Sequence, residues 1–567
     1  MKDVYEPLER YKNYFKQEFK KNTQAVFDHL CGLASVDTEA NRALCAKIYK
    51  LQEEESDSRN KGDRFLYASI GCFLIGALFL FFYFSEYCPP EWKMYSPTLS
   101  VGLTAVLVCL IISFIYKWKD WSKRADRVRE KMQVKIDEAY QQMSSLNALF
   151  GEDIPMKLIR KTVPKLEFDP FFTRGRLSEL VNDFGFRDLS GELISLLSAK
   201  SGTINGNPFV IARFKYMKMG TKVYEGYRTI TWTEYSYGPD GKRCPVTRSE
   251  RLTATVSKPY PYYTEATFVI YGNDAAPNLK FERNPSNLLS GFMHKRKQNR
   301  KRKELKEFSQ NLNDEYNYTM MGNEEFEMLF ETKYRNDETE YRLLFTPLAQ
   351  EQMLKLIKDE TDSFGDKFVF MKDKKINYVS ADQLEAISLD VGQLDFADYD
   401  FERCREKFLS INESIFKTLY FAMAPILSIP LYQQHRTQKT IYGSDDSRSS
   451  SWEWECLLNG VDEESVRRLK HVGCVTDHIV KAKKKKDVSD GMTEIEAVSC
   501  GFAGADRCDT VRVWGSDGNM HRVDVPWVEY SPVTQSSQLM VEDLKMETSE
   551  EDEFLPFRQT HACRLHF

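Results

Sequence analysis

Two long apolar runs interrupt a chain in which apolar and polar residues otherwise alternate over short segments. The first run, 65–84, and the second, 95–116, contain no charged residue, and a short loop, 85–94, separates them. About 20 apolar residues in an α-helix cover the hydrocarbon core of a bilayer. A soluble amphipathic helix of that length carries a polar stripe, and the first run has none. The pattern predicts a transmembrane hairpin over 63–117.

Lysine and arginine flank the two runs unevenly. Basic residues cluster before the first run and after the second, whereas the loop holds only Lys93. The flanking residues are Lys50, Arg59, Lys61, Arg64, Lys117, Lys119, Lys123, Arg124, Arg127 and Arg129. Positive charge stays on the cytoplasmic side of membranes. We therefore expect a multi-pass protein of the plasma membrane with both termini in the cytoplasm.

Helical periodicity continues on both sides of the predicted hairpin. Apolar residues recur every three or four positions within 1–62, predicted to be N-terminal cytosolic helices, and within 118–152, predicted to be a helical stalk. The two segments either pack against each other or mediate self-association. The pattern alone is compatible with both arrangements.

From 153 to about 440 the pattern changes to that of strands. Segments rich in Val, Ile, Thr and aromatic residues occur at 209–219, 227–237, 251–258 and 265–272, with a turn signal at 238–242. They predict an antiparallel sheet in a strand-rich cytosolic domain with flanking helices. The apolar segment 415–432 contains Lys417, Pro425 and Pro430. It has three interpretations: a helix packed on the domain, a contact with the membrane surface, or a third span.

A basic stretch, 294–306, lies within this domain. Its charged side chains suit either a solvated helix face or attraction to anionic lipid headgroups. The predicted membrane-surface patch comprises Lys295, Arg296, Lys297, Arg300, Lys301, Arg302 and Lys303. No aromatic residue interrupts the run, so nucleic acid is not expected as a partner.

The segment 322–358 combines aromatic, acidic and Thr-Pro positions. It reads as a strand ending at Tyr334, a second strand over 341–345 and a helix that begins at Pro347 with Thr346 as its N-cap. A hairpin with its turn near Asp373 follows. The residues that make up this pattern are Phe326, Phe330, Asp337, Glu340, Tyr341, Leu343, Leu344, Thr346, Pro347 and Leu354.

This segment resembles the DUF3137 family of uncharacterised bacterial membrane proteins. The resemblance covers roughly 60–435 and implies the same order of parts: helices, membrane hairpin, stalk and strand-rich domain. Phe345 interrupts the family's step from leucine to Thr-Pro. The resemblance implies no reaction and no ligand.

The C-terminal part begins after a Ser/Asp-rich linker, 441–451. Residues 452–567 are predicted to form a small β-rich domain with a hairpin that turns at Asp517–Gly518, and 546–554 is an acidic tail. Histidines and cysteines gather in this part. The candidate metal ligands are His471, Cys474, His478, Cys500 and Cys508.

Zinc prefers such ligands, and helical spacing would place the first three on one face. The spacings match no standard finger or ribbon, and core thiols with surface histidines are the other explanation. We predict no cofactor, with a structural zinc ion as the alternative. The 12 scattered cysteines indicate a reducing compartment rather than a disulfide framework.

No nucleotide-binding, zinc-protease or serine-hydrolase motif occurs, and catalytic residues are unknown. The net charge of −5 creates no general attraction to polyanions. The predicted fold class is an α+β membrane protein. The favoured function is a membrane-anchored cytoplasmic interaction or sensory module, whose partners are the bilayer, an unknown protein or a second copy. The alternative is an enzyme acting at the inner face of the membrane.

Overall fold

A computed structural model describes residues 5–566 except 85–96, 188–192, 238–242, 287, 290–293, 311–317, 437–447, 490 and 545–562. The fold is α+β, and the chain forms two compact units. Unit 1 comprises Met1–Asn22, Glu152–Val391 and Asn412–Phe567, and unit 2 comprises Thr23–Gly151 and Gly392–Ile411. The predicted domain boundaries remain predictions.

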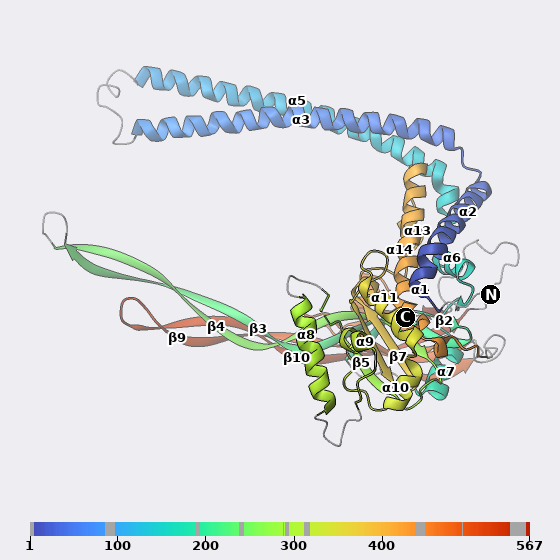
Figure 1. Cartoon of the computed structure of the whole chain (residues 1–567). Helices are drawn as coiled ribbons and strands as arrows, with labels where there is room; N and C mark the ends of the chain where they lie inside the picture. The colour runs from blue at the N-terminus through green and yellow to red at the C-terminus, as the bar shows by residue number, and fades with distance from the viewer. Residues whose placement is uncertain are drawn as a thin grey trace. The chain divides into compact units, whose positions relative to one another are not determined.

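Unit 2 is built around two long helices, α3 (Thr38–Phe84) and α5 (Pro97–Asn147), which lie side by side in Figure 1. Leu44 and Ile48 of α3 pack with Ala139 of α5 in a small buried cluster. A Cβ atom on Gly62 would lie 3.3 Å from the Trp121 side chain, so the two helices approach closely there. Of the two arrangements considered for these helical segments, packing against each other is confirmed.

The predicted transmembrane hairpin is wrong for the part of the chain that the structure describes. No helix there is long and apolar enough to cross a membrane. Each charge-free run forms only part of a helix, 65–84 in α3 and 97–116 in α5. The rest of α3 and α5 is rich in charge. This finding overturns the membrane fold class and the multi-pass plasma-membrane localisation.

Unit 1 contains a seven-stranded antiparallel sheet in the order β1-β2-β3-β4-β7-β6-β5. Its strands are β1 (Leu166–Phe168), β2 (Ile194–Ile204), β3 (Asn207–Tyr237), β4 (Arg243–Gly272), β5 (Lys280–Arg283), β6 (Phe368–Asp373) and β7 (Ile376–Ala381). The four predicted strand segments merge into β3 and β4, and the predicted turn at 238–242 lies outside the described residues. The hairpin near Asp373 is confirmed by β6 and β7.

A second antiparallel sheet has the order β11-β10-β9-β8. It comprises β8 (Ile479–Ser489), β9 (Met492–Trp514), β10 (Met520–Asp543) and β11 (Cys563–His566), and its β9–β10 turn confirms the predicted hairpin at Asp517–Gly518. Helix α15 (Ser451–Asn459) joins the two sheets. Trp452 packs with Phe214 of β3 and with Phe172, which lies between β1 and α7, while Trp454 lies in the apolar cluster of the second sheet.

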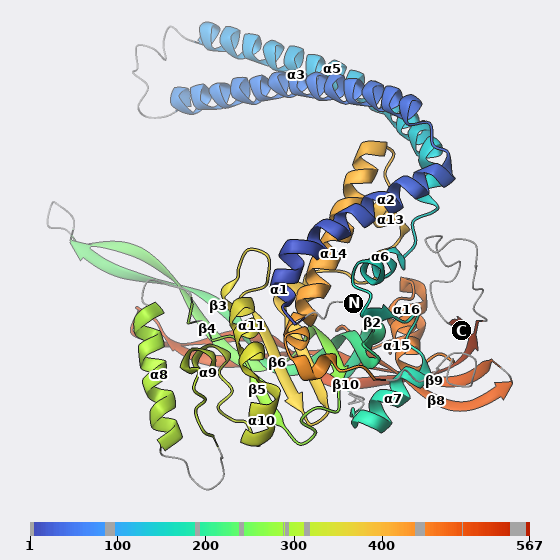
Figure 2. The ribbon, with the colours of Figure 1, turned by 45° about the vertical axis from the view of Figure 1, so that its right-hand side comes forward.

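The hairpins β3–β4 and β9–β10 extend as two stacked ribbons, which leave the body of unit 1 in the same direction in Figures 1 and 2. Ile230 and Leu252 of the first ribbon pack against Val523 and Val525 of the second. A Cβ atom on Gly226 would lie 2.2 Å from the carbonyl oxygen of Asp524. The backbones therefore approach so closely there that only glycine fits.

The remaining helices of unit 1 cover the sheets or flank them. They are α1 (Pro7–Arg10), the π-helix η1 (Tyr11–Phe15), α6 (Ile154–Thr162), α7 (Arg174–Phe184), α8 (His294–Gln310), α9 (Glu324–Phe330), α10 (Glu338–Leu344), α11 (Pro347–Lys358), α12 (Asp382–Glu385), the 3-10 helix η2 (Pro430–Gln433) and α16 (Glu463–Leu469). Helix α13 (Gln393–Phe396) belongs to unit 2, and α2 (Lys16–Ala34) and α14 (Phe401–Leu427) contribute residues to both units.

The two strands predicted to end at Tyr334 and to cover 341–345 are wrong. The segment forms α9 and α10 instead, because Asp337 accepts a hydrogen bond from the backbone N–H of Glu340 and caps α10. Short apolar runs suit strands and helices alike. The predicted N-cap is confirmed, since the Thr346 hydroxyl accepts from the N–H of Ala349 at the start of α11.

The apolar segment 415–432 is a helix packed within unit 1. It forms the second half of α14, which continues through Pro425, and the short η2. The Phe416 ring stacks on Phe19, and the buried Tyr420 lies against Tyr11. The first of its three interpretations is confirmed, and the membrane-spanning one is wrong. Most of the predicted linker, 441–447, and the acidic tail, 546–554, lie outside the described residues.

Lys372 is a buried cation in the core of the first sheet. Its side chain, on β6, is 2% exposed, and its ammonium donates to the backbone carbonyl of Ala275 at 3.1 Å. Burial lowers the pKa of Lys372 to about 7, against a weaker opposing effect of Glu340. The folded protein therefore releases a proton that the unfolded chain keeps.

We expect the free energy of unfolding to rise between about pH 7 and about pH 10, because only the unfolded state then binds this proton. The slope from Lys372 reaches about 1.4 kcal/mol per pH unit at most. Lys372→Met should remove this rise and stabilise the protein at neutral pH. Urea unfolding at several pH values measures both effects. Lys280→Met, on the exposed face of β5, is the control, and equal slopes in the two variants would contradict the expectation.

Candidate functional site

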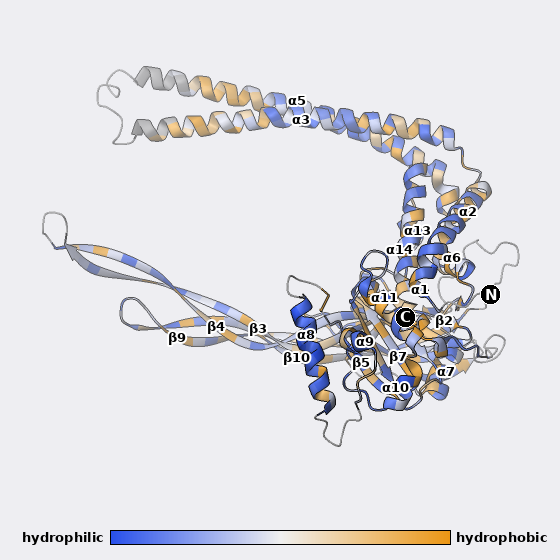
Figure 3. Cartoon of the chain, in the orientation of Figure 1, coloured by the Kyte–Doolittle hydropathy of each residue, from blue (hydrophilic) through white to orange (hydrophobic). Residues whose placement is uncertain are grey.

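Helix α8 carries the predicted basic patch and is the most strongly charged surface element of unit 1. Figure 3 colours it deep blue along most of its length. Its inner side is apolar: Leu305 is 1% exposed, and the Phe308 ring packs edge-on against Tyr318 at 5.5 Å. These contacts hold the C-terminal half of the helix against the neighbouring segment and leave its other face in solvent.

The C-terminal half of α8 is neutralised by acidic neighbours. Lys301 pairs with Glu331 at 2.5 Å and Lys306 with Glu324 at 2.7 Å, and Arg302 also lies 3.3 Å from Glu324. The hydrogen bond from Lys306 lowers the pKa of the Glu324 carboxyl. Two of the predicted patch residues, Lys301 and Arg302, therefore attach the helix to acidic neighbours, whereas Lys303 lies 3.9 Å from Glu307 of α8 itself.

The N-terminal half of α8 is different. Its cations are exposed, and among the described residues none has an acidic partner within ion-pair distance. We call this group the basic end of α8; it comprises Lys295, Arg296, Lys297 and Arg300. The positive end of the helix dipole lies here as well, and each cation in a first turn costs about 0.3–1 kcal/mol. Helix stability therefore does not explain the charge, whereas an anionic ligand would offset the repulsion.

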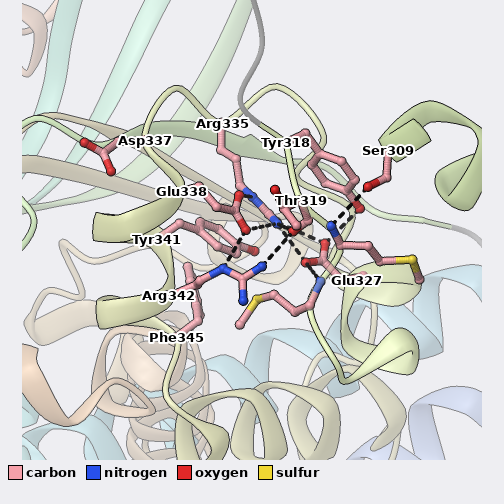
Figure 4. A network of polar contacts seen from close by, with 12 residues as sticks. Ser309, Tyr318, Thr319, Glu327, Arg335, Asp337, Glu338, Tyr341, Arg342 and Phe345 are labelled. Atoms are coloured by element: carbon pink, nitrogen blue, oxygen red, sulfur yellow. Dashed lines mark hydrogen bonds and ion pairs between the residues drawn. The ribbon is translucent and has the colours of Figure 1, made fainter. Parts of the chain in front are cut away.

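A buried ionic cluster supports the segment on which α8 lies, as Figure 4 shows. The Arg335 side chain is 0% exposed and donates to Glu327 at 2.9 and 3.0 Å and to Glu338 at 2.6 Å. Its guanidinium also lies 3.9 Å from the centre of the Tyr341 ring. The N–H of Met320 donates to the Ser309 hydroxyl of α8 at 3.4 Å, which links the cluster to the helix.

The residues that carry the DUF3137 resemblance lie in this supporting segment and serve its fold. Phe326 and Phe330 stack at 4.9 Å and pack with Phe345. Asp337 and Thr346 cap helices. These contacts are ring packing and helix capping. The residues that carry the resemblance therefore stabilise the fold of this segment.

A separate cavity of about 200 Å³ lies between β2 and α15. Its charged lining residues are Glu152, Asp169, Lys200, Asp390 and Glu453. The Lys200 ammonium lies 3.2 Å from Asp390. Burial opposes its charge, but the nearby carboxylates prevail and raise the pKa of Lys200. The carboxylates therefore favour the charged form of Lys200 in this cavity.

The predicted metal ligands do not converge. His471, Cys474 and His478 lie in the non-helical segment between α16 and β8, where the Cys474 thiol donates to the carbonyl of Thr476 at 3.5 Å. Cys500 lies on β9 next to this segment, and Cys508 is exposed farther along the same strand. In the part of the chain that the structure describes, no group of three or more His, Cys, Asp or Glu side chains could hold a metal ion.

The sequence predicted the basic patch. It did not predict that residues of the C-terminal half of α8 form ion pairs with Glu324 and Glu331. The acidic partners Glu324 and Glu331 come from α9 and the residue after it, outside the basic run. It also missed Arg335 and the cavity around Lys200. Nothing local distinguishes these residues, because their burial depends on segments distant in the chain.

We expect Arg335→Met to destabilise unit 1 by about 3–5 kcal/mol, because it leaves the Glu327 carboxylate buried without its cation. Arg342→Met is the matched control: it removes an arginine that pairs with the same Glu338 but is 45% exposed, and should cost about 1 kcal/mol or less. Denaturant unfolding measures both. Equal destabilisation of the two variants would argue against the assigned role of the buried cluster.

Comparisons of the chain with protein-family models, with curated proteins and with solved structures found no match. The resemblance to the DUF3137 family therefore stays a prediction.

Proposed function

We propose that this chain is a non-catalytic interaction module and that the basic end of α8 binds an anionic surface, such as the headgroups of acidic lipids. The observation that carries the proposal is a group of exposed cations that have no acidic partner among the residues the structure describes. The other half of the same helix is paired with glutamates. Association of this kind needs no membrane-spanning helix.

Charge and shape favour such a partner. Each lysine or arginine near an anionic lipid surface contributes about 1 kcal/mol, so four of them supply a useful binding energy without any shaped pocket. The first turn of a helix also offers backbone N–H groups and a positive dipole to phosphate oxygens. Single-stranded nucleic acids are bound through aromatic side chains on which bases stack, and the basic end of α8 contains no aromatic residue.

The proposal is tested with two variants that remove the same charge from different surfaces. Lys295→Gln with Lys297→Gln acts on the basic end of α8. Lys483→Gln with Lys485→Gln removes two exposed lysines from β8. We expect the first pair to weaken binding to vesicles containing phosphatidylserine by roughly 10–30-fold, since about 2 kcal/mol is lost, and the second pair to have little effect.

Co-flotation of the full chain with vesicles measures the binding. Vesicles of phosphatidylcholine alone should recover little protein, and added salt should release the protein from the acidic vesicles, because screening weakens attraction between exposed charges. Equal loss of binding in both double variants, or equal binding to neutral vesicles, would refute the proposal.

A further inference from the structure

The distal part of β3 has an unpaired edge. Among the described strands, β2 pairs with β3 only as far as Tyr216, and from Met217 to Tyr237 the only partner of β3 is β4. The segment Thr229–Tyr237, which we call the distal edge, lies at the far end of the ribbon. A Cβ atom on Gly515, in the β9–β10 turn, would lie 2.7 Å from Ile230, so that turn meets β3 at the beginning of the distal edge.

Three prolines show which backbone groups this edge presents. Pro245, Pro259 and Pro261 of β4 face Tyr235, Thr221 and Met219 of β3 in one uninterrupted register. Proline has no N–H, so it occupies strand positions whose N–H would point away from the partner strand. Residues opposite one another in such pairs both point their N–H and C=O outward. The odd-numbered residues of the distal edge therefore offer free backbone groups.

Three other edges of the described sheets carry residues that oppose strand addition. Edge strand β8 carries a run of four lysines, 483–486, and the outer edge of β4 is interrupted by the three prolines. The proximal part of β3 carries Lys218, Lys222 and Arg228. Lysine and proline are the usual protection of exposed edges.

The distal edge lacks this protection. Its sequence, TITWTEYSY, contains no Lys, Arg, Pro or Gly and consists mainly of strand-forming residues. Its one charge, Glu234, is already paired with Arg248 of β4 at 2.7 Å. A bare two-stranded ribbon is also marginally stable, and added strands stabilise it.

We propose that the distal edge pairs antiparallel with the same edge of a second copy, so that two ribbons form one continuous four-stranded sheet. The two-fold axis passes through Thr233, which places Thr231 opposite the second copy's Tyr235 and Thr229 opposite its Tyr237. All these positions are odd-numbered, so each pair exchanges backbone hydrogen bonds. Threonine–threonine and aromatic–β-branched pairs are favourable across strands.

This register also separates like charges. Glu234 lies opposite Trp232 of the second copy rather than opposite the other Glu234. An axis through Glu234 would also place odd-numbered residues opposite one another. It would, however, bring the two Glu234 carboxylates together. Self-pairing about Thr233 uses the whole distal edge, because Thr233 is its central residue.

A proline scan of the two edges tests the proposal. Thr233→Pro removes an outward N–H from the distal edge without breaking the β3–β4 ladder, and Thr247→Pro does the same on the opposite edge, since the two threonines face each other. In analytical ultracentrifugation, the full chain should shift from monomer to dimer as its concentration rises. Thr233→Pro should stay monomeric, and Thr247→Pro should behave like the unaltered chain. Circular dichroism of both variants checks that they fold.

A cross-link gives an independent measurement. Hydrogen-bonded antiparallel residues have Cα atoms about 5.5 Å apart, within the range that a disulfide spans. In a Cys244→Ser background, which removes the exposed thiol of the same ribbon, Thr233→Cys should form a covalent dimer on oxidation and Thr247→Cys should not. A chain that is monomeric at every concentration, equal effects of the two prolines, or equal cross-linking of the two cysteines would overturn the proposal.

Discussion

The uninterrupted ladder between β3 and β4 is the constraint on which most of unit 1 depends. Its register runs without a shift from Phe209↔Tyr271 to Tyr237↔Arg243, whereas the β2–β3 and β8–β9 ladders both contain irregularities. Because side chains alternate between the faces of a strand, one slipped residue would move every side chain of the pair to the wrong face. The same register therefore places Val210 and Ile270 in the core and Ile230 in the ribbon stack, and decides which backbone groups the distal edge exposes.

Buried charges are stabilised by ion pairs, whereas exposed charges are stabilised by water. The buried Arg335 is fully surrounded by Glu327, Glu338 and a backbone carbonyl, because an unpaired ion in that position would be costly. The cations of the basic end of α8 remain in water, where solvation is the alternative to pairing. Phe308 and Ser309 of α8 contact Tyr318 and Met320, so the segment that Arg335 stabilises also holds the C-terminal half of α8.

Local chemistry made several elements predictable. Thr346 followed by Pro347 predicted the start of α11, and Asp517–Gly518 predicted the β9–β10 turn, because capping and turn conformations depend on residues adjacent in the chain. The failures have a common origin. The short apolar run at 341–345 fits a strand or a helix equally well, and only capping by Asp337 and packing of Tyr341 beneath Arg335 decide for the helix. The transmembrane hairpin was inferred from the composition of two apolar runs, and no helix among the described residues meets the length and apolarity of a span.

Taken by itself, the sequence determined the positions of turns and caps, the strand-rich and helical regions, and the basic composition of 294–306, since each is a property of neighbouring residues. Tertiary structure decided that four strand segments join into two long ones, that half of the basic helix is neutralised, and that α15 holds two sheets together through Trp452 and Trp454. These features arise from contacts between residues far apart in the chain, and desolvation and hydrogen-bond pairing at such contacts have no signature in local sequence.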